Sequence, residues 1–225
     1  MPGCCEPQGY DRVFDDREAR RAARRYRRSG LTVLPRRTVE LYRAGEVSGA
    51  TLLEVGAGIG DFTVEMMRAG VDRATCVDLS GAYDHAAAEL LTEAGLAARV
   101  QRVVGDLAAQ PDAVEPVDIV ALHSVVCCYP DARRLLTAAA SRARRFLVVS
   151  FPRGWLRLWA PVSNIYPRLR GSDWRFVVHP RETILQAAAD AGFEVQRIER
   201  LRVDEHVVLV RLDDTDPRRA TTLDP

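Results

Sequence analysis

The chain has no lysine, no long apolar run and few cysteines. All 32 basic residues are arginine, and 31 acids balance them to a formal net charge of +1. This balance excludes a global attraction to nucleic acid or to a membrane surface. No apolar run approaches the roughly 18 residues that a membrane-spanning helix requires.

The cysteines are also too few for a disulfide scaffold. There are five, an odd number, and no apolar leader precedes the chain's first charged segment. This usage favours a reducing compartment, so we expect a cytoplasmic protein. A length of 225 residues with 47% apolar composition predicts one folded domain with a substantial core.

Short β-rich runs alternate with helical segments through most of the chain, which predicts an α/β fold. Five largely apolar runs are typical of parallel strands with helices on both faces. Two more alternating runs, joined by Val203-Asp204-Glu205, predict a terminal antiparallel hairpin. The result is a Rossmann-like seven-stranded mixed sheet, with strands at 50–55, 74–79, 99–104, 117–123, 145–151, 193–201 and 206–212.

Two segments fall outside this core. Residues 1–45 predict a helical arm that acts as a lid, and residues 152–178 predict a lid insertion within the main domain at 46–212. All three tryptophans lie in the insertion, where we expect them to line an apolar pocket. The polar residues 213–225 predict a flexible tail.

The strongest motif is the glycine loop in LLEVGAGIGD at 52–61. Glycines let a backbone turn sharply and approach a ligand that side chains would exclude. A structural strand–helix turn is the alternative, because a lone glycine loop is weak evidence. A dinucleotide fingerprint has the spacing G-x-G-x-x-G, whereas this loop reads G-x-G-x-G with Glu54 two residues before its first glycine. That acid would repel phosphate and suit a ligand carrying an ammonium and a sulfonium.

Two more acids follow neighbouring strands. Asp78 closes the second strand, where a carboxylate can accept both hydrogen bonds of a ribose diol. Asp106 follows the third strand, where it can meet an adenine amino group. Either acid alone can be a turn residue or a helix cap. Three acids at successive carboxyl ends of parallel strands predict a nucleoside-binding crevice.

This pattern resembles the class I S-adenosylmethionine-dependent methyltransferases over roughly residues 46–212. The resemblance implies S-adenosylmethionine as cofactor, held on its methionine side by the loop and on its nucleoside side by the later acids. The implied cofactor-binding residues are Glu54, Gly56, Ala57, Gly58, Gly60, Asp78, Leu79, Asp106, Leu107 and His123.

The arm YDRVFDDREARRAARRYRRSGL, the stretch LHSVVCCYPD and the later VHP resemble the magnesium-protoporphyrin O-methyltransferase group. In that group the N-terminal helices fold over the cofactor, and a histidine of an H-Y-P triplet acts with an arm tyrosine. Here the triplet is Cys128-Tyr129-Pro130, and the arm tyrosine is either Tyr26 or Tyr10. The departure falls at the chemistry, so the resemblance implies the fold and the cofactor but not a porphyrin substrate.

A phenol, alcohol or ammonium acceptor must lose a proton, whereas a carboxylate acceptor needs no base. The catalytic candidates are His123, Cys128, His179 and Tyr26. His179 has an alternative role in capping or packing at a helix start, and we expect His85 and His206 on the solvated surface. Cys127 and Cys128 have the alternative of simple packing. Cys4 and Cys5 could approach them to give a zinc or disulfide-exchange site, but adjacent cysteines suit zinc poorly, so no metal is expected.

These observations predict a methyltransferase acting on a small hydrophobic or aromatic metabolite, by O-methylation in a specialised biosynthetic pathway. One alternative is a cofactor-binding regulatory or scaffold protein without activity. Another is RNA methylation. The seven arginines from Arg17 to Arg28 either attract an anionic substrate, a phosphate-bearing carrier or RNA, or form a solvated helix face. We expect no membrane or nucleic-acid partner, and a homodimer stays open.

Overall fold

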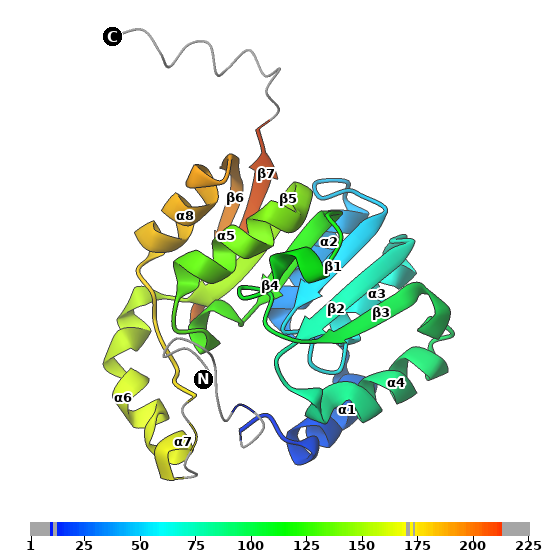
Figure 1. Cartoon of the computed structure of the whole chain (residues 1–225), viewed down its shortest axis with the longest axis horizontal. Helices are drawn as coiled ribbons and strands as arrows, with labels where there is room; N and C mark the ends of the chain where they lie inside the picture. The colour runs from blue at the N-terminus through cyan, green and yellow to red at the C-terminus, as the bar shows by residue number, and fades with distance from the viewer. Residues whose placement is uncertain (1–9, 11–12, 170–171, 173, 213–225) are drawn as a thin grey trace, which may run out of the picture.

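A seven-stranded sheet runs through the centre of the computed structural model (Figure 1). The structure describes residues 10, 13–169, 172 and 174–212, so Cys4, Cys5 and the tail at 213–225 lie outside the described residues. The strand order is β3-β2-β1-β4-β5-β7-β6. The strands are β1 (Thr51–Val55), β2 (Arg73–Asp78), β3 (Val100–Val104), β4 (Val117–His123), β5 (Ala143–Pro152), β6 (Phe193–Arg200) and β7 (Asp204–Arg211).

The pairing of these strands confirms the predicted mixed sheet. β1, β2, β3, β4 and β5 pair in parallel, and β7 pairs antiparallel with both β5 and β6. The order reverses between β1 and β4, which creates a switch point at the carboxyl ends of the parallel strands. Ligands of open α/β sheets bind at such a point.

Helices cover both faces of the sheet, and each face has its own apolar core. One core packs α5 (Ala132–Arg142) and α8 (Arg181–Asp190) against the strands. The other core packs the arm and the early crossover helices against the opposite face. Its helices are α1 (Asp16–Ser29), α2 (Val33–Arg43), α3 (Asp61–Ala69) and α4 (Asp84–Glu93).

Polar side chains cap two of the helix starts. Asp131 caps α5 by accepting a 3.0 Å hydrogen bond from the Arg134 amide. Aspartate takes the cap because its side chain satisfies an otherwise unpaired amide. Pro180 stands at the N-cap of α8 rather than at N1. Ser80 caps the short 3₁₀ turn η2 (Gly81–Tyr83), which leads into α4.

The insertion after β5 forms three short helical segments at the edge of the molecule (Figure 1). They are η6 (Gly154–Leu158), α6 (Ala160–Ser163) and α7 (Ile165–Leu169). Within the described ranges of the chain, no helix is both long enough and apolar enough to cross a membrane.

Candidate active site

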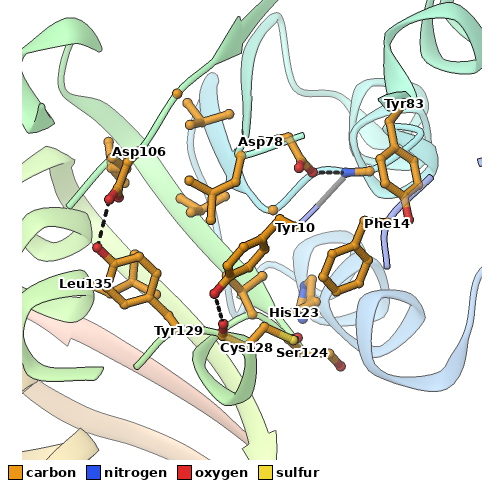
Figure 2. A pocket seen from close by; sticks show the side chains of 18 residues that line it. Tyr10, Phe14, Asp78, Tyr83, Asp106, His123, Ser124, Cys128, Tyr129 and Leu135 are labelled. Carbon is orange, nitrogen blue, oxygen red and sulfur yellow. Dashed lines mark hydrogen bonds between the residues drawn. The ribbon is translucent and has the colours of Figure 1, made fainter. Parts of the chain in front are cut away.

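A cavity lies at the carboxyl ends of β1, β2, β3 and β4, at the switch point of the sheet (Figure 2). Each of these strands contributes its last residues or the first residues of the following loop. Tyr10 and Phe14 of the arm also line the cavity. The lining residues are Tyr10, Phe14, Val55, Gly56, Gly58, Val77, Asp78, Leu79, Tyr83, Gly105, Asp106, Leu107, His123, Ser124, Val125, Cys128, Tyr129 and Leu135.

The glycine loop brings bare backbone to the cavity wall. Gly56 and Gly58 have φ angles of 68° and 51°, a left-handed conformation that glycine adopts without steric cost. A Cβ atom on Gly56 would lie 2.4 Å from Cγ2 of Val125, so the loop has no room for a side chain there. The two glycines therefore fit the predicted role of allowing a ligand close to the backbone.

Asp78 ends β2 with its carboxylate beside this loop (Figure 2). Its Oδ2 accepts a 2.7 Å hydrogen bond from the Gly58 amide, and its Oδ1 accepts a 3.0 Å bond from the Ser80 amide. Burial raises the pKa of Asp78, while these two amides oppose the rise. A carboxylate has about four lone-pair sites, so two acceptor sites are left for a ligand diol.

Asp106 occupies the corresponding place after β3 (Figure 2). Its Oδ2 accepts a 2.8 Å hydrogen bond from the Tyr129 hydroxyl, and its Oδ1 accepts a 2.9 Å bond from the Ala108 amide. Leu79 and Leu107 line the same cavity. The structure thus brings Asp78, Asp106 and both leucines to one cavity, as the sequence predicts.

Three other predicted binding residues do not line the cavity. Glu54 is buried with its carboxylate turned toward α3, where Oε2 accepts a 2.6 Å hydrogen bond from the Thr63 hydroxyl. Burial raises the pKa of Glu54 to about 8, although Thr63 opposes the rise. Side chains alternate along a strand, so the acid before the loop faces the helix layer and not the ligand. Ala57 and Gly60 shape the loop without lining the cavity.

His123 ends β4 at the cavity, and a buried chain of polar contacts leads away from it. Its Nε2 lies 3.2 Å from Oγ1 of Thr38 on α2, and that oxygen lies 2.8 Å from Nε2 of His206 on β7. The expectation of a solvated His206 is wrong, because α2 covers this face of the hairpin and leaves the side chain fully buried. A threonine hydroxyl donates only one proton, so it donates to one histidine and accepts from the other, which couples their tautomers.

Burial opposes the protonation of both histidines. Burial lowers the pKa of His123 to about 3, and His206 adds to that effect. Burial also lowers the pKa of His206 to about 4, with Glu199 opposing. Both rings are therefore neutral at pH 7.

Replacing His206 with glutamine is expected to make folding less sensitive to acid. The unfolded chain binds a proton on this histidine below about pH 6.5, whereas the folded chain does so only near pH 4, so stability falls as the pH drops through that window. Between pH 7 and pH 5 the unfolding free energy of the wild type should fall by about 2 kcal/mol more than that of H206Q. Denaturant titrations at both pH values measure the difference. The matched control is H85Q, since the His85 side chain is 80% exposed. Equal acid sensitivity of H206Q and the wild type would contradict the assignment.

The arm supplies Tyr10 and Phe14 to the cavity, where both rings lie among the lining side chains (Figure 2). The Tyr10 hydroxyl donates a hydrogen bond to the backbone carbonyl of Cys128. Phe14 packs edge-on against Trp174 at 5.7 Å between ring centroids. Within the described chain no tryptophan lines this cavity, since Trp155 and Trp159 are exposed and Trp174 packs against Phe14. That corrects the predicted tryptophan-lined pocket.

Tyr26 lies away from the cavity. Its hydroxyl donates a 2.7 Å hydrogen bond to Glu65 and accepts one from Arg68, so it joins α1 to α3. The repeated arginines around Tyr26 leave the alignment of the arm with the resembling group ambiguous. Of the two candidate arm tyrosines, Tyr10 is therefore the one that lines the cavity.

Ser124 and the 3₁₀ turn η5 (Val126–Cys128) form the wall next to His123. Ser124 has a φ of 58°, the one left-handed non-glycine residue among those described, and its amide donates to the Ser150 hydroxyl. Its carbonyl lies 3.6 Å from the Cys128 thiol. Cys128 lines the cavity as predicted, and Cys127 is buried behind it with a pKa raised by the neighbouring Cys128 thiol and by burial.

His179 contacts the backbone of a cavity-lining residue but does not itself line the cavity. Its Nε2 lies 2.9 Å from the Tyr129 carbonyl, and it borders a separate cavity beside the insertion. This contact fits the structural alternative for His179 and does not bring it to the reacting side. Among the described residues, no group of three or more His, Cys, Asp or Glu side chains could hold a metal ion.

Several lining residues escaped the sequence analysis. Tyr83 and Leu135 come from helices whose cavity-facing positions follow from tertiary packing, and Val125 and Phe14 come from irregular segments. Thr38 joins the histidines from a helix that the sequence analysis assigned to a lid. A polar residue within an apolar helix face was the one available signal for it.

Residues 52–147 match the protein family described as a methyltransferase domain. Among curated protein sequences, none matches the chain.

Solved structures share the fold of this chain. Magnesium protoporphyrin IX methyltransferase from Synechocystis PCC 6803, solved with bound S-adenosylhomocysteine, is 21% identical with a TM-score of 0.65, covering 91% of this chain and 94% of its own. An O-methyltransferase family protein from Burkholderia thailandensis is 17% identical with a TM-score of 0.69, covering 92% of this chain and 64% of its own. An O-methyltransferase family 2 protein from Planctomyces limnophilus, solved with apigenin, is 18% identical with a TM-score of 0.62, covering 88% and 62%.

Proposed function

We propose that this chain is a class I S-adenosylmethionine-dependent methyltransferase and that it methylates an oxygen of a small hydrophobic or aromatic acceptor. The observation that carries the proposal is the cavity where the glycine loop, Asp78 and Asp106 meet His123 and the arm. Two of the solved structures with this fold are associated with flat aromatic molecules. One is named for magnesium protoporphyrin IX, and the other was solved with apigenin.

The cavity residues fit the cofactor. Asp78 has two acceptor sites left for the ribose diol, and Gly56 and Gly58 present backbone without a Cβ to the amino-acid part. Leu79 and Leu107 supply apolar walls for the adenine, with Asp106 at its edge. When bound, S-adenosylmethionine supplies an electrophilic methyl group on a sulfonium.

The residues on the acceptor side of the cavity are better suited to aligning the methyl donor and acceptor than to removing a proton from the acceptor. His123 is neutral, and with a pKa lowered to about 3 it is a weak base. Burial raises the pKa of Tyr10 above its ordinary value, so its hydroxyl stays protonated. Holding donor and acceptor in line and excluding water can supply most of the rate. These properties favour an acceptor oxygen that is already anionic at pH 7, such as a carboxylate.

Incubation with methyl-labelled cofactor and a panel of hydrophobic carboxylates, phenols and amines tests this function. We expect label in the carboxylates above the other two classes. Transfer to RNA or protein alone would refute the small-molecule assignment. Calorimetric binding of the cofactor without transfer to any member of the panel would favour the non-catalytic alternative.

Two tyrosine-to-phenylalanine variants separate the cavity tyrosine from the distant one. Y10F removes the hydroxyl that joins the arm to the Cys128 carbonyl, and a hydrogen bond of about 1 kcal/mol predicts a roughly fivefold loss of methyl transfer. Y26F removes contacts to Glu65 and Arg68 and should lower the unfolding free energy by about 1 kcal/mol without changing kcat. Steady-state kinetics and denaturant titration of both variants measure the split. The reverse pattern would assign the arm-tyrosine role to Tyr26.

A further inference from the structure

The insertion presents a row of large apolar side chains to solvent. Leu158 and Leu169 are 83% and 81% exposed, and the other four members are between 47% and 60% exposed. The remaining exposed large apolar residues, for example Val33 and Val104, come from different elements. We call the following set the apolar row: Trp155, Leu158, Trp159, Val162, Ile165 and Leu169.

The apolar row follows helical spacing through η6, α6 and α7. Its members recur at intervals of three or four residues, with a single step of one, a spacing typical of one side of a helix. Figure 1 shows α6 and α7 at one corner of the molecule, apart from the sheet and its covering helices. Proteins rarely expose this many large apolar side chains within one short segment without a binding role.

Positive charge surrounds the apolar row. No acid occurs between Arg153 and Ser172, whereas Arg157 and Arg168 are exposed within that span. The cavity beside the insertion is lined by Arg153, Arg157, Arg181 and His179, together with Glu182 and Glu205. Glu205 already pairs with Arg181 and Arg200. Within the described chain, neither Arg153 nor Arg157 has an ion-pair partner.

We propose that the apolar row docks on an anionic lipid surface. Tryptophan and leucine on one side of a short helical segment, with arginine around them, are the composition that enters the boundary between headgroups and acyl chains. Arg153 and Arg157 then meet lipid phosphates. This departs from the expectation of no membrane partner, and it does not rest on the proposed methyl transfer.

The charge argues for lipid over a second copy of the chain. A twofold-symmetric partner would bring its own apolar row and its own arginines to the same place, so that unpaired positive charges would face each other. An anionic surface removes that repulsion and buries the same side chains.

Flotation of the full chain with vesicles tests the proposal. Vesicles of phosphatidylcholine alone are compared with vesicles of phosphatidylcholine and phosphatidylglycerol in equal amounts. We expect at least about tenfold tighter binding to the anionic vesicles, weakened by added salt. Tryptophan emission should shift to the blue on binding, because Trp155 and Trp159 leave water.

Three variants locate the contact. L158E places a charge in the apolar row and should weaken vesicle binding at least about tenfold. R157Q should weaken it about fivefold. The matched control is V33E, which makes the same kind of change at a side chain that is 62% exposed on α2, and it should bind as the wild type does. Circular dichroism verifies that each variant keeps its fold.

Several results would overturn the proposal. These are no binding to either vesicle, equal binding to both, or equal effects of L158E and V33E. A concentration-dependent dimer that L158E abolishes, without vesicle binding, would instead assign the apolar row to a second copy.

Discussion

Replacing Asp78 with asparagine should weaken binding of S-adenosylmethionine roughly 10- to 100-fold, the cost of losing a hydrogen bond to a charged group. Both carboxylate oxygens are already committed to holding the Gly58 and Ser80 amides in place. An asparagine keeps one of these acceptors and turns an amide nitrogen toward the other N–H. The ribose therefore loses its charged acceptor, and the loop loses one of its two anchors. Calorimetry with the cofactor and with its demethylated product measures the change.

The control for this variant is D72N, which neutralises an exposed acid just before β2. It should leave cofactor affinity unchanged, because Asp72 lies outside the cavity. Thermal unfolding without ligand shows whether D78N remains folded. Unchanged affinity in a folded D78N would remove Asp78 from the site while leaving the fold assignment intact.

Replacing Gly56 with alanine should lower the unfolding free energy by about 2–5 kcal/mol and abolish measurable cofactor binding. Two effects add. A left-handed φ of 68° costs about 1–2 kcal/mol for a residue with a Cβ, and overpacking against Val125 costs about 1–3 kcal/mol more. Val125 cannot turn aside easily, because branching at Cβ restricts its χ1. Denaturant titration measures the loss.

Gly105 provides the matched control for this clash. It lines the same cavity, but it has no left-handed φ and no neighbour within 4 Å of an added Cβ. G105A should therefore change stability by about 0.5 kcal/mol or less, as surface substitutions do. The double variant G56A/V125A should recover the overpacking part of the loss and retain the backbone part. If G56A and G105A unfold alike, the close contact with Val125 is wrong.

The fold could be predicted from the sequence because the periodicity of apolar residues and the positions of the turn residues indicated the same elements. The seven expected strands match the observed ones to within two residues at every end, and the glycine loop and its following acids meet where parallel strands end. Local pattern is enough for these features because the carboxyl ends of parallel strands share one edge of a sheet.

The wrong predictions concern side chains whose burial or direction depends on elements that are distant in the sequence. His206 lies on a strand whose alternation resembles a half-exposed hairpin, and only the packing of α2 over it explains the buried contact with Thr38. Tyr26 and Tyr10 both fit the expected arm tyrosine in sequence, and only their contacts distinguish them, since Tyr26 bonds to Glu65 and Tyr10 to the Cys128 carbonyl. Glu54 was assigned from its spacing to the glycines, whereas its side-chain direction along β1 points it at Thr63.

The hydrogen bond from Tyr10 ends on a backbone carbonyl and not on the Cys128 side chain. Every residue type carries that carbonyl, so the side chain at 128 can be exchanged while the arm keeps its anchor. The thiol lines the cavity where the resembling group has a histidine. The cavity wall at position 128 and the anchor of the arm can therefore be changed independently of each other.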